Sequence, residues 1–142
     1  MAKTTFNATA AWTGKGPQIK VTARGHSLIV DQPEDAGGKD SGPTPLELQL
    51  GALGSCLSTL GFAFAGEFGV ELNGIGVDVE GDLDPDGYMG TAEVPYGFQE
   101  IRFKIRIDSP SAKDKIDALV EHMKKICPIR NTLQGVPVKP AE

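Results

Sequence analysis

The sequence predicts a single α+β domain over residues 1–142, and three segments carry that prediction. Apolar and charged residues alternate strictly over residues 101–108, which is the pattern of a strand with one buried face. Residues 45–67 form a long, nearly uncharged apolar segment of helical length. Residues 110–127 carry apolar side chains at helical spacing. The chain shows no internal repeat and no second composition regime, so one core is expected.

Composition excludes several classes of protein. Hydrophobic residues make up 39% and charged residues 23% of the chain, which is ordinary for a globular domain. The net charge of -5 and the lack of a basic cluster argue against a nucleic-acid partner. The start of the sequence lacks the basic and apolar regions of a secretory signal, and no apolar run reaches the length of a membrane span. We therefore expect a cytoplasmic protein with reduced thiols and no membrane partner.

The first third of the chain predicts strands followed by a loop. Weak alternation over residues 4–13 indicates a half-buried strand, and the turn at 14–17 leads to strands at 19–24 and 27–31. Residues 32–43 are rich in turn formers and have no apolar period, which is typical of surface or site architecture.

Three residues together mark the start of the long helix. Thr44 is a suitable N-cap, Pro45 fits the first helical position, and Glu47 completes a capping box. We expect the helix to continue to about Glu67 and to end at Gly69.

Two stripes run along this helix, one large and apolar and one small. The large residues are Leu50, Leu53, Leu57, Leu60, Phe64 and Phe68. The small residues are Gly51, Gly54, Ser58, Gly61 and Ala65. A helix that is apolar all round is buried on every side, and a short chain has little material to cover it. The pattern therefore favours burial against a second copy of the chain, while a helix covered by its own sheet is the alternative.

The second half predicts another set of elements. Strands are expected at 70–83 and 101–107, with a turn at 84–87 between them. Ser109-Pro110 is expected to cap the second helix, which ends at Cys127 because Pro128 follows. Residues 133–138 are expected to form a short closing strand at a sheet edge.

Any chemistry of this chain is expected to lie with its two cysteines. Cys56 is on the buried helix and Cys127 on the inner face of the amphipathic one, too far apart in sequence for a C-x-x-C motif. Two inert core cysteines are the alternative interpretation, since free cysteine is commonly buried. A zinc site built with His26 and His122 is disfavoured, because His122 points off the helix face and no ligand pair has finger spacing. No metal and no cofactor is expected.

Each cysteine lies in a longer motif. The first motif is the run Asp31-x-Pro33, Gly37-Gly38-x-Asp40-x-Gly42-Pro43-x-Pro45-x-Glu47 followed by Ala52-Leu53-Gly54-Ser55-Cys56. The second is Cys127-Pro128-Ile129-Arg130-Asn131. The two motifs resemble the OsmC/Ohr family, most closely its YhfA-like branch, and the second is similar to the family motif Cys-Pro-aromatic-Ser-Asn. The resemblance implies an OsmC-like fold, with antiparallel sheets packed on a long central helix and a second amphipathic helix, in an intertwined homodimer.

The resemblance also implies peroxide reduction by Cys56, with Cys127 as the resolving cysteine and a dithiol as the reductant. Local physics agrees with this division, because a helix C-terminus disfavours a thiolate at Cys127. Cys56 is about three turns into its helix, beyond the reach of the N-terminal dipole, so it needs a nearby cation.

The group that activates Cys56 is less clearly marked. Arg24 is the candidate for the arginine that the family supplies from its N-terminal strands, and Lys15 and Arg130 are the alternatives. The family's glutamate position falls on Leu46, one residue before Glu47. Glu47 lies half a turn out of phase with the cysteine, so its expected role is the capping box.

The expected function is that of a thiol-dependent peroxidase for organic hydroperoxides. Its partners would be a second copy of the chain, a small hydroperoxide and a dithiol reductant. The alternative is a non-catalytic OsmC-like dimer that binds a small apolar ligand in a pocket at the interface.

Overall fold

A computed structural model describes residues 2–141. The chain divides into two compact units, one up to Gln49 and one from Leu50 onward. The boundary falls inside the first long helix, α1 (Pro45–Phe64). The prediction of one domain over the whole chain stays a prediction.

The first unit holds a three-stranded antiparallel sheet in the order β1-β2-β3. Its strands are β1 (Thr9–Trp12), β2 (Ile19–Ala23) and β3 (His26–Val30), at the predicted places but shorter than predicted. Arg24 and Gly25 join β2 to β3 with positive φ angles of 51° and 82°. Left-handed geometry at both positions matches the right-handed twist of the paired strands.

The glycine-rich loop after β3 is organised by the buried carboxylate of Asp31, which is 1% exposed. This carboxylate accepts hydrogen bonds from the backbone N–H groups of Gln32, Lys39 and Ser41 and from the Ser41 hydroxyl. The Ser41 hydroxyl contributes most to lowering the pKa of Asp31 from 3.8 to about 2. Gly38 is required because a Cβ there would overlap the carbonyl of Gln32. The loop is thus a folded structure that contains the short 3₁₀ turn η1 (Glu34–Ala36).

We expect Asp31→Asn to destabilise the N-terminal unit in a pH-dependent way. The carboxylate has a lower pKa when folded, so its stabilisation is complete above about pH 4 and is lost as the pH falls toward 2. Urea unfolding followed by the fluorescence of Trp12 should show a large difference from the wild type at pH 7 and a much smaller one near pH 2. Asp35→Asn, an exposed change in the same loop, is the control. A difference that stays constant with pH would contradict the expectation.

The start of α1 confirms the predicted capping box. The N–H of Thr44 donates to Oε1 of Glu47 at 2.9 Å, and the N–H of Glu47 donates to Oγ1 of Thr44 at 3.2 Å. The bond from the Thr44 backbone is the main reason why the pKa of Glu47 is lowered. Near the expected end, Gly69 adopts a positive φ of 68°.

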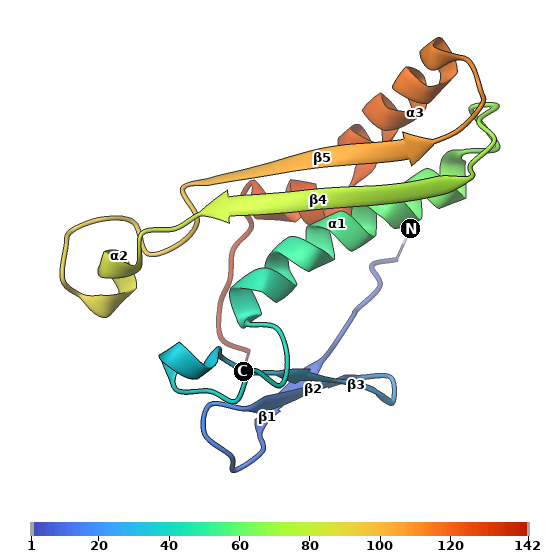
Figure 1. Ribbon diagram of the computed structural model, residues 1–142. Helices are drawn as coiled ribbons and strands as arrows, with labels where there is room; N and C mark the ends of the chain where they lie inside the picture. The colour runs from blue at the N-terminus through green and yellow to red at the C-terminus, as the bar shows by residue number, and fades with distance from the viewer. Residues whose placement is uncertain (1, 142) are drawn as a thin grey trace. The chain divides into compact units, whose positions relative to one another are not determined.

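The second unit packs a two-stranded antiparallel sheet against α1 (Figure 1). Strands β4 (Gly74–Asp82) and β5 (Glu100–Asp108) pair along their whole length. Their inner face is apolar and joins the core of α1 and the second long helix, α3 (Lys113–Ile126). On the outer face, Arg102 pairs with Asp82 at 2.7 Å and Arg106 with Asp78 at 2.8 Å. The alternation predicted for 101–108 is therefore confirmed.

Three local predictions in this unit are wrong. The expected turn at 84–87 is the start of a short helix, α2 (Pro85–Met89), because Asp84 accepts from the N–H of Asp86 and caps it. Helix α3 begins at Lys113 rather than after Ser109-Pro110, and the Ser109 hydroxyl accepts only from the N–H of Ser111. The expected strand at 133–138 is absent from the described residues, where a further helix, α4 (Pro128–Leu133), is followed by irregular chain.

Helix α1 is covered on one side rather than all round within this chain. Leu53 and Leu57 are buried at 2% and 0% exposure, whereas Phe62 is 77% exposed. Gly54 and Gly61, predicted to face a second copy, instead allow close approach of Val79 and Ile75 from the chain's own β4. Over residues 51–63, the outward face carries small or apolar residues and no charge: Gly51, Ala52, Ser55, Thr59, Phe62 and Ala63. Of the helices within residues 2–141, none has the length and apolar character needed to cross a membrane.

Candidate active site

The fold brings the two cysteines together. Sγ of Cys127 lies 3.4 Å from Sγ of Cys56, and both thiols are free. Cys56 comes from the middle of α1, and Cys127 from the junction of α3 and α4. Both pack into the core that α1 and α3 share. This packing, rather than closeness in the sequence, brings the two sulfurs together. A disulfide bond of roughly 2 Å would need only a small movement of the sulfurs.

Cys127 ends one helix and begins the next. It is the C-cap of α3 and also the N-cap of α4, and its Sγ accepts from the N–H of Arg130 at 3.4 Å. Pro128 makes this possible, because it has no N–H to lose at the first position of a new helix. The prediction that Cys127 lies at the C-terminus of a helix is confirmed, and the start of a second helix at the same residue was not predicted. Its sulfur also faces the N–H groups of α4.

Side chains of α4 hold this junction in place. Arg130 donates from Nη1 to the carbonyl of Lys124 at 3.1 Å. Asn131 donates from Nδ2 to the carbonyls of Lys125 and Cys127, at 3.3 and 2.8 Å. These carbonyls are among those that the end of α3 leaves without helical partners. The junction is thus fixed by its own few residues.

Cys56 is partly exposed, in contrast to Cys127, which is 0% exposed. Burial is the main cause of a raised pKa at Cys56, and the neighbouring Cys127 raises it further. A hydrogen bond from the backbone of Ile129 acts in the other direction. The second unit by itself therefore favours the thiol form of Cys56, and a thiolate there needs an additional positive charge.

The proposed activating groups have different surroundings. Arg24 and Lys15 lie in exposed turns of the first unit, and their role stays a prediction. Arg130 does lie beside the cysteine pair, but the side-chain bond that it makes goes to the carbonyl of Lys124. Within residues 50–141, no basic side chain donates to Sγ of Cys56. Glu47 is engaged in the capping box.

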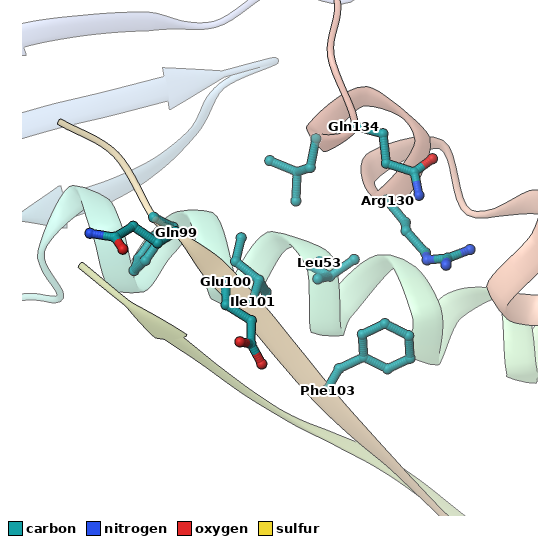
Figure 2. A pocket seen from close by; sticks show the side chains of 9 residues that line it. Leu53, Gln99, Glu100, Ile101, Phe103, Arg130 and Gln134 are labelled. Atoms are coloured by element: carbon teal, nitrogen blue, oxygen red, sulfur yellow. The ribbon is translucent and has the colours of Figure 1, made fainter. Parts of the chain in front are cut away.

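The same unit contains a pocket of about 350 Å³ (Figure 2). Its apolar lining is Leu53, Phe98, Ile101, Phe103 and Leu133, and its polar lining is Gln99, Glu100, Arg130 and Gln134. Leu53 lies one turn before Cys56 on α1, and Arg130 follows Cys127 on α4. The pocket therefore touches both elements that carry the sulfurs.

The surroundings of His122 are aromatic. His122 packs against the rings of Phe64 and Phe68, with centroids 4.7 and 5.1 Å away. His26 begins β3 in the other unit. No group of three or more potential ligands in the described part of the chain is placed to hold a metal ion.

The hydrogen bond from the backbone of Ile129 to Cys56 and most of the pocket lining were not predicted from the sequence. One signal for the Ile129 contact is present in the sequence: proline directly after cysteine fits the first position of a new helix as well as the end of an old one. The pocket has no comparable signal, because its lining comes from α1, β5 and α4, which only tertiary packing brings together.

Comparison with known proteins agrees with this geometry. Residues 38–141 match the family model described as OsmC-like protein. The chain belongs to the OsmC-like family. A hydroperoxide reductase of Mycoplasma genitalium is 28% identical over 100 residues, which cover 68% of this chain and 66% of that protein.

Solved structures of OsmC-like proteins share the fold. The OsmC-like protein from Mycoplasma pneumoniae superposes with a TM-score of 0.80 at 23% identity, over 95% of this chain and 91% of that one. An organic hydroperoxide resistance protein OsmC from Legionella pneumophila gives a TM-score of 0.64 at 20% identity, over 95% and 93%. The predicted α+β fold of the OsmC type is thereby confirmed.

Proposed function

We propose that this OsmC-like protein is a thiol-dependent peroxidase that reduces organic hydroperoxides through Cys56 and Cys127. The observation that carries the proposal is the 3.4 Å approach of two free sulfurs, one partly exposed and one fully buried. The exposed sulfur can meet a substrate, and the buried one is placed to trap the product. The name of the Mycoplasma genitalium relative, hydroperoxide reductase, supports the same class of reaction.

The proposed cycle transfers two electrons. The thiolate of Cys56 attacks the terminal oxygen of ROOH, the O–O bond breaks, and the alcohol ROH leaves with a proton as Cys56 becomes a sulfenic acid. The thiol of Cys127 then attacks that sulfur, and water leaves as the disulfide forms. A dithiol reductant returns both cysteines to thiols and is itself oxidised to a disulfide.

We also propose that the protein acts as a homodimer built on the outward face of α1. That face is uncharged and carries the large exposed side chain of Phe62 between small residues, which suits close packing of a second helix. The cation that Cys56 needs would come from Arg24 or Lys15 of the N-terminal unit, or from Arg130.

Titration of free thiols tests the peroxidase proposal directly. One equivalent of cumene hydroperoxide should remove both thiols of the reduced protein within minutes, and the mass should fall by two hydrogens. The same treatment with cumyl alcohol is the control. If the thiols react no faster than free cysteine at neutral pH, the peroxidase is excluded. A ligand-binding role for the apolar pocket would then be the better account.

A further inference from the structure

We propose that the pocket of Figure 2 selects hydroperoxides that carry an anionic group, and that Arg130 is the residue that binds this group. The inference rests on the proposed function, because it assigns a substrate class to the same site. It concerns specificity rather than the chemical step.

The pocket is suited to an organic molecule rather than to hydrogen peroxide. Five of its nine lining residues are apolar. Leu53 from α1, together with Ile101 and Phe103 from β5, supplies an apolar wall. Its volume of about 350 Å³ lies within the range typical of small-ligand pockets. A hydrocarbon or aromatic body would bury its surface against this wall.

Charged side chains of both signs line the pocket. The carboxylate of Glu100 lies 3.1 Å from Arg102, which also pairs with Glu80 and Asp82. Arg130 is the cation among the described lining residues, and within residues 50–141 no carboxylate lies within ion-pair distance of it. One of its nitrogens is bonded to the carbonyl of Lys124, which fixes the side chain and leaves further N–H donors of the planar fork available.

The position of Arg130 links this charge to the reacting sulfurs. Its backbone N–H donates to Sγ of Cys127, so the same residue contacts the redox pair and lines the pocket. Leu53, which also lines the pocket, stands one turn from Cys56 on α1. A ligand whose anionic group meets the guanidinium would therefore lie against the two elements that carry the sulfurs. Carboxylates are the natural partners of this fork.

A binding experiment tests the inference without any turnover. In the full-length Cys56→Ser variant, calorimetry should show 4-isopropylbenzoate binding about tenfold more tightly than the neutral 4-isopropylbenzyl alcohol, with the preference shrinking as salt is added. Adding Arg130→Gln should remove the preference, and Arg130→Lys should keep part of it. Lys125→Gln, an exposed cation nearby on α3, is the matched control and should keep it all.

Kinetics then separates specificity from catalysis. In the protein with both cysteines, Arg130→Gln should raise KM about tenfold for the para-carboxylate derivative of cumene hydroperoxide and should change KM for cumene hydroperoxide itself much less, and any loss of kcat should be the same for both substrates. Equal affinity for acid and alcohol, no binding of either probe, or an equal rise in KM for both substrates would overturn the inference. A preserved preference for the acid in a protein that consumes no peroxide would reject the peroxidase proposal and leave the anion site standing.

Discussion

Replacement of Cys56 by serine should abolish hydroperoxide consumption, whereas replacement of Cys127 should leave a single turnover. A hydroxyl at position 56 cannot form a sulfenic acid, and the fully buried Cys127 offers peroxide little access. Without Cys127, the sulfenic acid on Cys56 has no thiol at 3.4 Å to resolve it. It should then be oxidised further to sulfinic and sulfonic acids, seen by mass spectrometry as added oxygens on the peptide that contains Cys56.

The two variants control for one another, because serine is nearly isosteric with cysteine at both positions. Circular dichroism should show that both keep the fold. Activity that survives in Cys56→Ser, or added oxygens found on Cys127 in that variant, would reverse the assigned roles. Such a result would give weight to the N–H of Arg130 at the Cys127 sulfur as an activating contact.

Substitutions at two adjacent positions of α1 should have different effects, because one position faces the core and the other lies on the proposed dimer face. Gly61→Leu should lower the free energy of unfolding by about 1–3 kcal/mol, because the new side chain would overpack Ile75 and Met123, whose Cε lies 3.1 Å from the site of an added Cβ. Phe62→Glu should leave the core intact, since Phe62 is 77% exposed within the chain, and should convert a dimer into a monomer. Urea unfolding and sedimentation at micromolar concentration measure the two effects.

Two results would contradict these expectations. If Gly61→Leu leaves stability unchanged but dissociates the protein, the glycine lies at the subunit contact and not against β4. If the wild type sediments as a folded monomer, the proposed dimer is wrong whatever Phe62→Glu does.

The periodic segments of this protein could be predicted from sequence because one physical signal dominates each of them. The alternation over 101–108 predicts β5, and the Thr44–Glu47 capping box fixes the start of α1 to the residue. The face that α1 buries could not be predicted in the same way. Its large and small stripes are both apolar, so hydrophobicity alone does not distinguish the side against β4 from the side left open.

The close approach of the two cysteines could not be predicted from the sequence either. Family motifs identify the two residues, but their 3.4 Å separation depends on how α1 packs against α3. The dual cap at Cys127 could not be predicted from the proline alone, because proline after a helix is equally compatible with irregular chain. Here it starts α4, which places the N–H of Arg130 beside the Cys127 sulfur.

The separation of 71 positions between the paired cysteines ties the redox state of the protein to its conformational stability. A bond across a loop of that length removes conformational freedom from the unfolded chain, worth about 4 kcal/mol in the loop-entropy model. By thermodynamic linkage, the folded state favours the disulfide by the same free energy, since it raises the effective concentration of one thiol around the other. Conditions that loosen the packing of α1 against α3 therefore also make the bond easier to reduce. In the proposed cycle, the core of this small protein is therefore part of the redox couple.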